Sequence, residues 1–422
     1  MKSSLFALAV AIFCASPAVH ALTLREAVVL ALDHDPRMQA GQDAIAASQA
    51  QKDQAAASYR PSIIASASAG RSTLRTTALF PTSGARWPNS ESIDVSQPLY
   101  AGGGISATAD VATFGMDSAR ESLSDTAAHI VLATIAAYLD VQRDRAVVAL
   151  SQADVRTLEK AQTDTHLRTE AGEATHTDEA QSEARLAEAQ AQLKSATAQQ
   201  HVSEAAFRRL TGIAPDELVD GWPGPVIPAS LQEALKLSAQ SPAVRAAEAD
   251  ARAAKSRIAV AGAAGRPQVS LDGSGGSQDN TEFGYDRVNE WSLQLKLAVP
   301  IYQGGMIRAR VSEAQARADQ AAALAEDLRR SYAESATQEW ERLQAADEVI
   351  RAYEAQEQAA ALALDGTRKE LAVGTRTTLD LLNADRELLA AQVNVVSSKH
   401  DRALNAFQLL AVCGRLNPQA VP

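Results

Sequence analysis

The clearest pattern along the chain is an alternation of apolar and polar residues in its second half. From Trp291 to Val299 an apolar side chain occupies every other position, which is the period of a half-buried β-strand. Val269 and Leu271, flanked by polar residues, begin the same pattern in the stretch before it. The predicted strands lie near residues 268–278 and 288–299 and, with weaker alternation, near residues 62–74 and 90–99.

Most of the remaining chain is predicted to form long helices. Residues 103–170 and 305–371 each give a helix of about 100 Å, a length that indicates coiled-coil packing against other helices. Shorter helices are predicted at residues 36–60, 175–212 and 375–412. Two short helices placed end to end match one long helix, which predicts a cylinder wall of long helices beside pairs of short ones.

The sequence contains two copies of one unit. The stretch QPLYAGG returns as VPIYQGG, and an Arg-Pro pair precedes the first strand of each predicted pair. Proline cannot donate to a sheet and glycine permits a bend, so we interpret these motifs as crossings between strand and helix, where the proline ends pairing. The predicted junction residues are Pro61, Pro98, Gly102, Gly103, Pro267, Pro300, Gly304 and Gly305.

The chain accordingly divides into two repeats behind a signal peptide. Residues 1–21 combine a positive start, a short apolar run and a small residue at the predicted cleavage site. The repeats span residues 22–212 and 231–414, a Pro/Gly-rich linker covers 213–230, and a tail covers 415–422. Each repeat is predicted to contain a helix, two strands, a long helix, a turn and a return helix.

The strands also have the length of membrane strands. At about 3.3 Å per residue and a tilt of about 45°, residues 291–302 cover the apolar band of an outer-membrane barrel, about 25 Å tall. Four strands cannot close a barrel, and an open sheet edge cannot face lipid. If the strands enter the membrane, several chains share one barrel, and three chains supply about 12 strands. The other reading of any one strand is the half-buried sheet of a soluble protein. Polar loops are predicted near residues 76–89 and 279–287.

Composition narrows the function. The net charge of −11 disfavours nucleic acid as a partner, and aromatic residues are only 4% of the chain, which argues against a large aromatic core. Without the signal peptide one thiol is left, Cys413, so no internal disulfide forms. No metalloprotease motif, nucleophile elbow or phosphate loop is present. We therefore expect no enzyme activity, cofactor or metal site, and we interpret His166 and His176 as surface residues.

Taken in order, these motifs resemble the TolC family of outer-membrane efflux ducts. The resemblance covers nearly the whole mature chain, including the Leu-x-Glu-Ala openings at Leu24 and Leu231, RRLTG at 208–212 and AVGTRTTLDLLNADREL from Ala372. It implies an α plus membrane-β fold: a homotrimer with one β-barrel of about 12 strands in the outer membrane, continuous with a periplasmic α-helical barrel. It further implies a passive duct recruited by a periplasmic adaptor and an inner-membrane transporter driven by ATP or protons.

The resemblance also assigns roles at the two helix-turn-helix tips. One position of the family's aspartate ring falls on Asp380, and the other falls on Asn383, where this sequence departs from the pattern. A gate tyrosine is replaced by Leu371, which has no hydroxyl. The other gate positions are Arg376, Thr177 and Asp178. The turns that resemble adaptor-docking sites contain Gly172, Glu173, Ala174, Val373, Gly374 and Thr375.

Helix-end chemistry is the simpler interpretation of the same residues. Glycines of this kind end helices, and a Thr followed three positions later by Asp is an acidic form of the capping box. Three copies of Asp380 around a narrow pore would concentrate cations, whereas a single carboxylate there is also favoured by the helix dipole.

The competing function is a periplasmic coiled-coil adaptor or scaffold that forms no channel. The two alternating strand pairs favour the duct over the scaffold. Within the duct class, the sequence is compatible with drug efflux, type I protein secretion and metal export. The VPIYQGG junction and the lack of a lipidation signal favour a type I or general-purpose duct.

Overall fold

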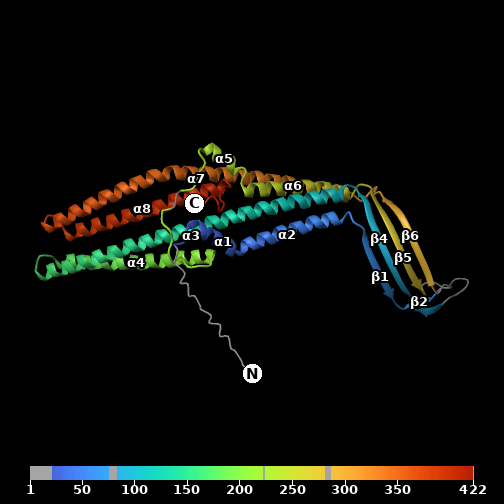
Figure 1. Cartoon of the computed structure of the whole chain (residues 1–422), viewed down its shortest axis with the longest axis horizontal. Helices are drawn as coiled ribbons and strands as arrows, with labels where there is room; N and C mark the ends of the chain where they lie inside the picture. Colours follow the sequence, from blue (N-terminus) through green and yellow to red (C-terminus); the bar gives the residue numbers. More distant parts are fainter. Residues whose placement is uncertain (1–20, 76–82, 222–223, 281–286, 422) are drawn as a thin grey trace, which may run out of the picture.

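The computed structural model describes residues 21–75, 83–221, 224–280 and 287–421. Residues 1–20 of the predicted signal peptide and the centres of both predicted strand loops lie outside these ranges. The molecule is elongated, with long helices along its main axis and a sheet that bends away at one end (Figure 1).

Both repeats contain the same order of elements, two helices, strands, a long helix and a return helix. The first repeat consists of α1 (Leu24–His34), α2 (Pro36–Ala57), β1 (Ser62–Ala69), β2 (Ser72–Arg75), β3 (Ser83–Arg86), β4 (Asn89–Ala101), α3 (Gly104–Glu170) and α4 (His176–Thr211). The second consists of α5 (Leu231–Ser238), α6 (Pro242–Ala263), β5 (Gln268–Asp279), β6 (Arg287–Ala298), α7 (Met306–Ala372) and α8 (Thr378–Val412).

β1, β4, β5 and β6 form one antiparallel sheet in the order β1-β4-β5-β6, so β1 and β6 are its edges. Its two faces differ sharply in chemistry. One row across the four strands contains Ile63, Val95, Gly273 and Leu293, and the row beside it contains Ser62, Ser96, Asp272 and Gln294. Because neighbouring rows point to opposite faces, one face is apolar and the other polar.

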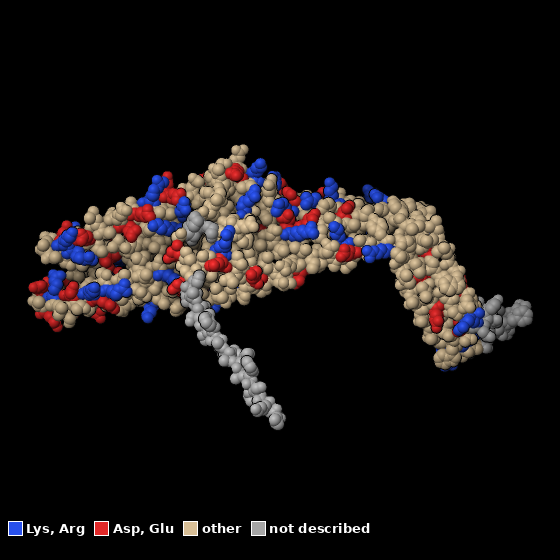
Figure 2. Space-filling view, viewed as in Figure 1, with Lys and Arg blue, Asp and Glu red and all other residues tan. Residues whose placement is uncertain are grey.

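The apolar face is uncovered in the single chain. Trp291 is 84% exposed and Leu293 75% exposed, and the space-filling view shows few charged residues over the sheet (Figure 2). On the polar face, Ser96 and Ser270 donate hydrogen bonds to the two carboxylate oxygens of Asp272, at 2.6 and 2.9 Å. The sheet thus matches the predicted division between lipid-facing and lumen-facing residues.

Three sequence predictions about the strands are wrong in detail. The strand predicted near residues 62–74 ends at Ala69, and β2 belongs to a different sheet. The polar loop predicted at 76–89 contains β3, which pairs with β2 as a separate hairpin, because the longer loop of this repeat can satisfy its own backbone hydrogen bonds. Pro98 does not end pairing either. β4 continues to Ala101 through a register shift next to Pro98, so a bulge accommodates the missing donor.

The helices form paired rods. α4 packs on α3 and α8 packs on α7, while α2 and α6 flank the parts of the long helices nearer the sheet. α3 and α7 have 67 residues each, and a pair of shorter helices covers the length of each one (Figure 1). This is the arrangement of long and short helices that the sequence predicts.

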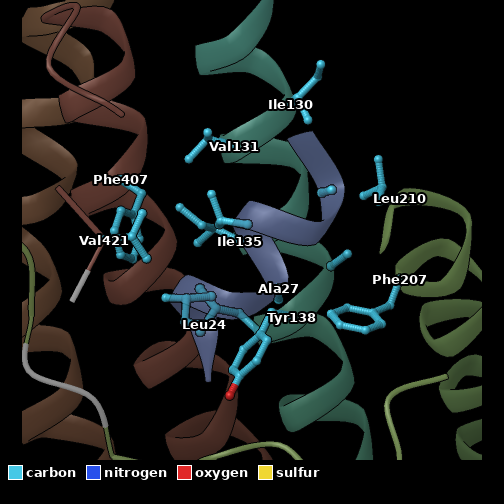
Figure 3. Packing of buried hydrophobic residues seen from close by; sticks show 14 of the residues in the cluster. Leu24, Ala27, Ile130, Val131, Ile135, Tyr138, Phe207, Leu210, Phe407 and Val421 are labelled. Atoms are coloured by element: carbon cyan, nitrogen blue, oxygen red, sulfur yellow. The ribbon is translucent and has the colours of Figure 1, made fainter. Parts of the chain in front are cut away.

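The largest apolar core lies at the middle of the rods, where α1, α3, α4, α8 and the C-terminal tail meet (Figure 3). We call this region the belt core. The Tyr138 hydroxyl lies 2.9 Å from the carbonyl oxygen of Leu22 and 2.8 Å from that of Val219, so it joins α3 to the N-terminal segment and the linker. Leu416 and Val421 of the tail are buried there as well, which the sequence did not predict.

Of the described helices, α3 alone is long and apolar enough to cross a membrane by length and composition, and 44% of that stretch is buried. Ile130, Val131 and Ile135 of α3 are fully buried in the belt core. Packing within the belt core therefore accounts for the hydropathy of this helix.

Candidate functional site at the helical tips

The two hairpins, α3 with α4 and α7 with α8, end side by side at the pole opposite the sheet (Figure 1). Their turns have the same backbone. Gly172 and Gly374 both adopt φ of 78°, a left-handed conformation that favours glycine. The next amide donates to the carbonyl five residues back in each turn, Glu173 to Arg168 at 2.8 Å and Thr375 to Glu370 at 3.0 Å. These bonds satisfy carbonyls at the end of each long helix.

A capping box opens each return helix. Asp178 Oδ2 accepts hydrogen bonds from the Thr175 amide at 3.0 Å and hydroxyl at 2.8 Å, and Asp380 Oδ2 accepts from Thr377 at the same distances. Donation by these threonines lowers the pKa of both carboxyl groups. Both aspartates are therefore charged at neutral pH and complete the first turn of a helix.

The structure of one chain does not assemble the latch that the sequence suggests. Arg376 Nε lies 2.9 Å from Glu370 Oε2 of its own hairpin. Among the residues that the structure describes, no hydrogen bond or ion pair joins Arg376 to Thr177 or Asp178. Asn383, which the sequence predicts at the second ring position, accepts a hydrogen bond from Arg185 of α4 at 3.3 Å. The gate roles of these residues stay predictions.

The tip surfaces are polar and exposed. Charged residues of both signs gather over both hairpin ends (Figure 2). At the first tip His166 Nδ1 lies 2.6 Å from Glu179 Oε1, and His176 Nδ1 lies 3.5 Å from Glu179 Oε2. At the second tip Val373 is 75% exposed. The two turns are thus accessible to a partner and differ in the side chains they present.

A cleft of about 900 Å³ separates the two tips. One wall comes from the last turns of α3, and the other from α7 and the start of α8. Leu158 and Leu382 close the inner end of the cleft, where they belong to a small apolar cluster with Val155 and Ala189. The hairpins therefore pack together up to this cluster and diverge beyond it.

A pair of carboxyl groups lies at the inner end of this cleft. Asp154 of α3 and Asp385 of α8 share a small cavity and interact through their side chains. Burial, together with the hydrogen bond and negative charge of Asp385, raises the pKa of Asp154 to about 7. Sequence reasoning missed this pair. The signal was a charged residue on an apolar helix stripe, since Asp385 lies three residues after the buried Leu382 and four before Leu389.

A second polar link between the repeats lies nearer the belt core. His400 of α8 is buried, with Nε2 2.9 Å from Asp140 Oδ1 of α3 and Nδ1 2.9 Å from Asp401 Oδ1. Burial of His400 opposes its charged form, but the two carboxylates outweigh it and raise the pKa of the imidazole. No sequence motif marks this histidine.

At the other end of the rods, the predicted junction residues lie where strand and helix meet. Pro61 and Pro267 directly precede β1 and β5, and Gly103 and Gly305 precede the first residue of the long helices with φ of 81° and 85°. A side chain at Gly102 would lie 2.6 Å from a backbone oxygen of α6. Of the other predicted junction residues, Pro300 and Gly304 lie between β6 and α7, whereas Pro98 lies within β4. The glycines thus permit both the bend and the close approach.

Within the described residues, no three His, Cys, Asp or Glu side chains are grouped so that they could hold a metal ion. Cys413 is a free, buried thiol. The candidate site is therefore a surface and a cleft made of helix ends.

Comparison with known proteins gives concordant matches. The family described as "Outer membrane efflux protein" matches residues 27–213 and 232–415, which are the two repeats. The outer membrane efflux protein BepC of Brucella suis is 29% identical over 365 residues, 86% of this chain and 78% of its own length.

Two solved structures illustrate the fold. VceC, an outer membrane protein of Vibrio cholerae, has a TM-score of 0.80 and 21% identity over 93% of this chain and 96% of its own. The CmeC outer membrane channel of Campylobacter jejuni has a TM-score of 0.83 and 17% identity, covering 93% of this chain and 85% of its own. The predicted TolC-like fold with two tandem repeats is confirmed.

Proposed function

The chain belongs to the outer membrane efflux protein family, and from this premise we propose that three copies form one exit duct. The protein is an outer-membrane channel of the kind that serves tripartite efflux or type I secretion systems. Its helical part extends into the periplasm. This function replaces the alternative of a scaffold without a channel. The family consists of channel proteins, and we assign this chain no catalytic step and no cofactor.

The open sheet is the single observation that carries the proposal of a trimer. β1 and β6 each have one unpaired edge, and the apolar face of the sheet is exposed. Unpaired backbone groups cannot face lipid, so another chain must cover each edge. Three copies with β1 paired to a neighbour's β6 give a closed barrel of about 12 strands. The polar face of the sheet, which contains Asp272, lines its interior.

The helical rods supply the periplasmic part of the duct. A helix of 67 residues is about 100 Å long, and α3 and α7 follow directly on the strands β4 and β6. The proposed trimer therefore continues the barrel as a helical tube, with the tips at its far end.

We propose that the tips receive a periplasmic adaptor, which in turn connects the duct to an inner-membrane transporter. The proposed docking turns contain Gly172, Glu173, Ala174, Val373, Gly374 and Thr375. Their exposure and their capped, hydrogen-bonded backbones support the proposal, because a preformed turn loses less entropy when it is bound.

A photoreactive residue at Thr375, in cells that express the full chain, tests docking. The expected result is a cross-link to an adaptor protein identified by mass spectrometry, while the same residue at Leu362, 74% exposed on α7 away from the tip, gives none. An adaptor of an ATP-driven exporter indicates secretion, and that of a proton-driven pump indicates small-molecule efflux. Self-adducts alone at Thr375 would contradict docking at this turn.

The narrowing of the duct is proposed to use Asp380, with Asn383, Arg376, Thr177 and Asp178 at neighbouring gate positions. Three copies of Asp380 would present a ring of carboxylates whose low pKa keeps them charged. Such a ring attracts cations into the tube.

Planar-bilayer recording of the purified protein tests both conduction and this ring. Asp380→Asn retains a side-chain oxygen for the helix cap, so the fold is preserved and the charge is lost. Block by multivalent cations is expected to weaken by about tenfold, with a fall in cation selectivity. Asp53→Asn, the same change at an exposed position of α2 far from the tips, is the matched control and should change block less. Equal effects of both variants, or none, would contradict the ring, and a protein without conductance would contradict the duct.

A further inference from the structure

The two hairpins contact each other between the belt core and the tips mainly through α3 and α8. The contact ends where the cleft begins, at Leu158 and Leu382. Asp154 and Asp385 lie directly beside these leucines, on the two helices that must separate if the tips move apart. Any interaction between these carboxyls therefore acts at the point where the hairpins diverge.

No cation among the described residues offsets the burial and the negative charges that raise the pKa of Asp154. Oδ2 of Asp385 is buried and accepts no hydrogen bond from the described protein. Two aspartates can hydrogen-bond to each other only if one of them holds a proton. Without that proton, two negative charges face each other in a partly apolar pocket, an arrangement that repels.

Neighbouring charged side chains do not relieve the repulsion between the two ionised carboxyls. Arg185 of α4 is engaged by Glu188 at 2.8 Å and by Asn383 at 3.3 Å, and Glu188 adds negative charge near the pair. Arg386 of α8 also lines the cavity, but Arg386 is exposed to solvent. The remaining charged groups line the wider cleft: Lys160, Asp164, Arg168 and Glu173 of the first hairpin and Arg368 of α7.

We propose that Asp154 and Asp385 form a proton-dependent clasp between the repeats, closed when the pair shares a proton and released when both carboxyls are ionised. The clasp sets how far the tips of one chain diverge. Because the pKa of Asp154 is raised from 3.8 to about 7, the contribution of the clasp is complete below the ordinary aspartate value and is lost as the pH rises to about 7. The expected consequence is that the periplasmic end of the duct is more open above neutral pH. Only this consequence rests on the proposed function.

The belt core provides a fixed point for this movement. Ile135 of α3 and Phe407 of α8 are fully or almost fully buried in it, about 20 residues from the clasp along each helix, or about 30 Å. Release of the clasp therefore lets the tips swing while the hairpins stay attached at the belt.

Distance measurement between two spin labels in one chain tests the clasp directly. The labels replace Glu173 at the first tip and Val373 at the second, both exposed, and labelled chains are diluted with unlabelled ones so that most trimers in the lipid nanodiscs contain one labelled chain. Burial raises the pKa of Cys413 to about 11, so this thiol does not compete for the label. The distance is expected to be longer at about pH 8.5 than at about pH 5.5, with the change complete once the pH exceeds about 7.

Asp385→Asn is the decisive variant. Its amide can donate to the Asp154 carboxylate at any pH, so the tips should stay close at both values and the pH step should disappear. Asp154→Asn should do the same from the other side, which guards against a folding defect in one variant. Asp164→Asn removes another carboxyl of the same cleft and should keep the step. His400 is retained in every variant, so its own titration is common to all.

A wild-type distance that does not change with pH, or a step that survives in both Asn variants, would overturn the clasp. Conductance measured on the same preparations separates the two proposals. Conducting protein with a constant tip distance contradicts the clasp alone, whereas a pH-dependent distance in protein that never conducts contradicts the duct alone.

Discussion

The belt core and the tips are built from the same helices but are stabilised in different ways. In the belt core, side chains from four helices and the C-terminal tail bury one another, with Tyr138 and Phe207 ring centroids 6.3 Å apart. At the tips, the polar contacts are mostly local, between residues three to six apart within one turn. Long-range burial fixes the belt, while the tips depend on caps and turns.

This difference indicates that the cost of local opening varies along the rods. A region with many buried apolar contacts opens only with global unfolding, whereas one held by exposed local bonds opens at low cost. The belt core can therefore keep α3 and α8 together while their ends separate. A duct that opens and closes at its periplasmic end needs this combination of a fixed middle and mobile tips.

The largest expected effect comes from the belt. Phe207→Ala removes a fully buried ring packed against Tyr138, and it should lower the free energy of unfolding by about 3–5 kcal/mol. Chemical denaturation of the detergent-solubilised protein, followed by circular dichroism, measures this loss. Leu362→Ala on the exposed surface of α7 is the control and should change stability by less than about 0.5 kcal/mol. Equal losses would contradict the importance of the belt.

Breaking a tip turn should cost less. Gly374→Ala forces a Cβ into the left-handed conformation and should destabilise the turn by about 1–2 kcal/mol. Hydrogen exchange is expected to accelerate in the last turn of α7 and the first of α8, with the belt unchanged. Gly366→Ala, in the interior of α7 with no neighbour in its way, is the matched control and should slow exchange. Faster exchange in the belt would show that tip and belt are not independent.

The smallest effect distinguishes the two tips from each other. The carboxylate of Glu179, which pairs with His166, raises the pKa of that imidazole, so the ion pair at the first tip is lost as pH rises through that raised value. The equivalent contact at the second tip joins Arg376 to Glu370 and involves no histidine. Hydrogen exchange, corrected for intrinsic pH dependence, should therefore rise only at the first tip, and His166→Gln should abolish the rise. The same rise at both tips would contradict this assignment.

Local chemistry explains how much of the fold the sequence predicts. The period-two pattern near Trp291 places β6 within about one residue of its observed bounds, and the Gly and Thr-Asp signals identify both tip turns. The duplicated Tyr-x-Gly-Gly motif marks both strand-to-helix crossings because only glycine adopts their backbone easily. These features depend on residues close together in the chain.

Features that depend on distant residues were not predicted. Asp154 and Asp385 form a pair only because α3 and α8 pack in one register, and no local pattern specifies that register. Burial of Val421 likewise depends on how the tail returns to the belt core. Pro98 was predicted to end its strand, but β5 supplies pairing on both sides of a bulge.

Disulfide scanning between the two sheet edges tests the central claim, one barrel shared by three chains, most directly. Ser62 of β1 lies in the same row as Gln294 of β6, so a cysteine at 62 is combined in turn with one at 292, 294, 296 or 298 in outer membranes of intact cells. The account predicts that at least one combination gives covalent dimers and trimers and nothing larger. Absence of any cross-link between chains, or a ladder that continues beyond three, would contradict it.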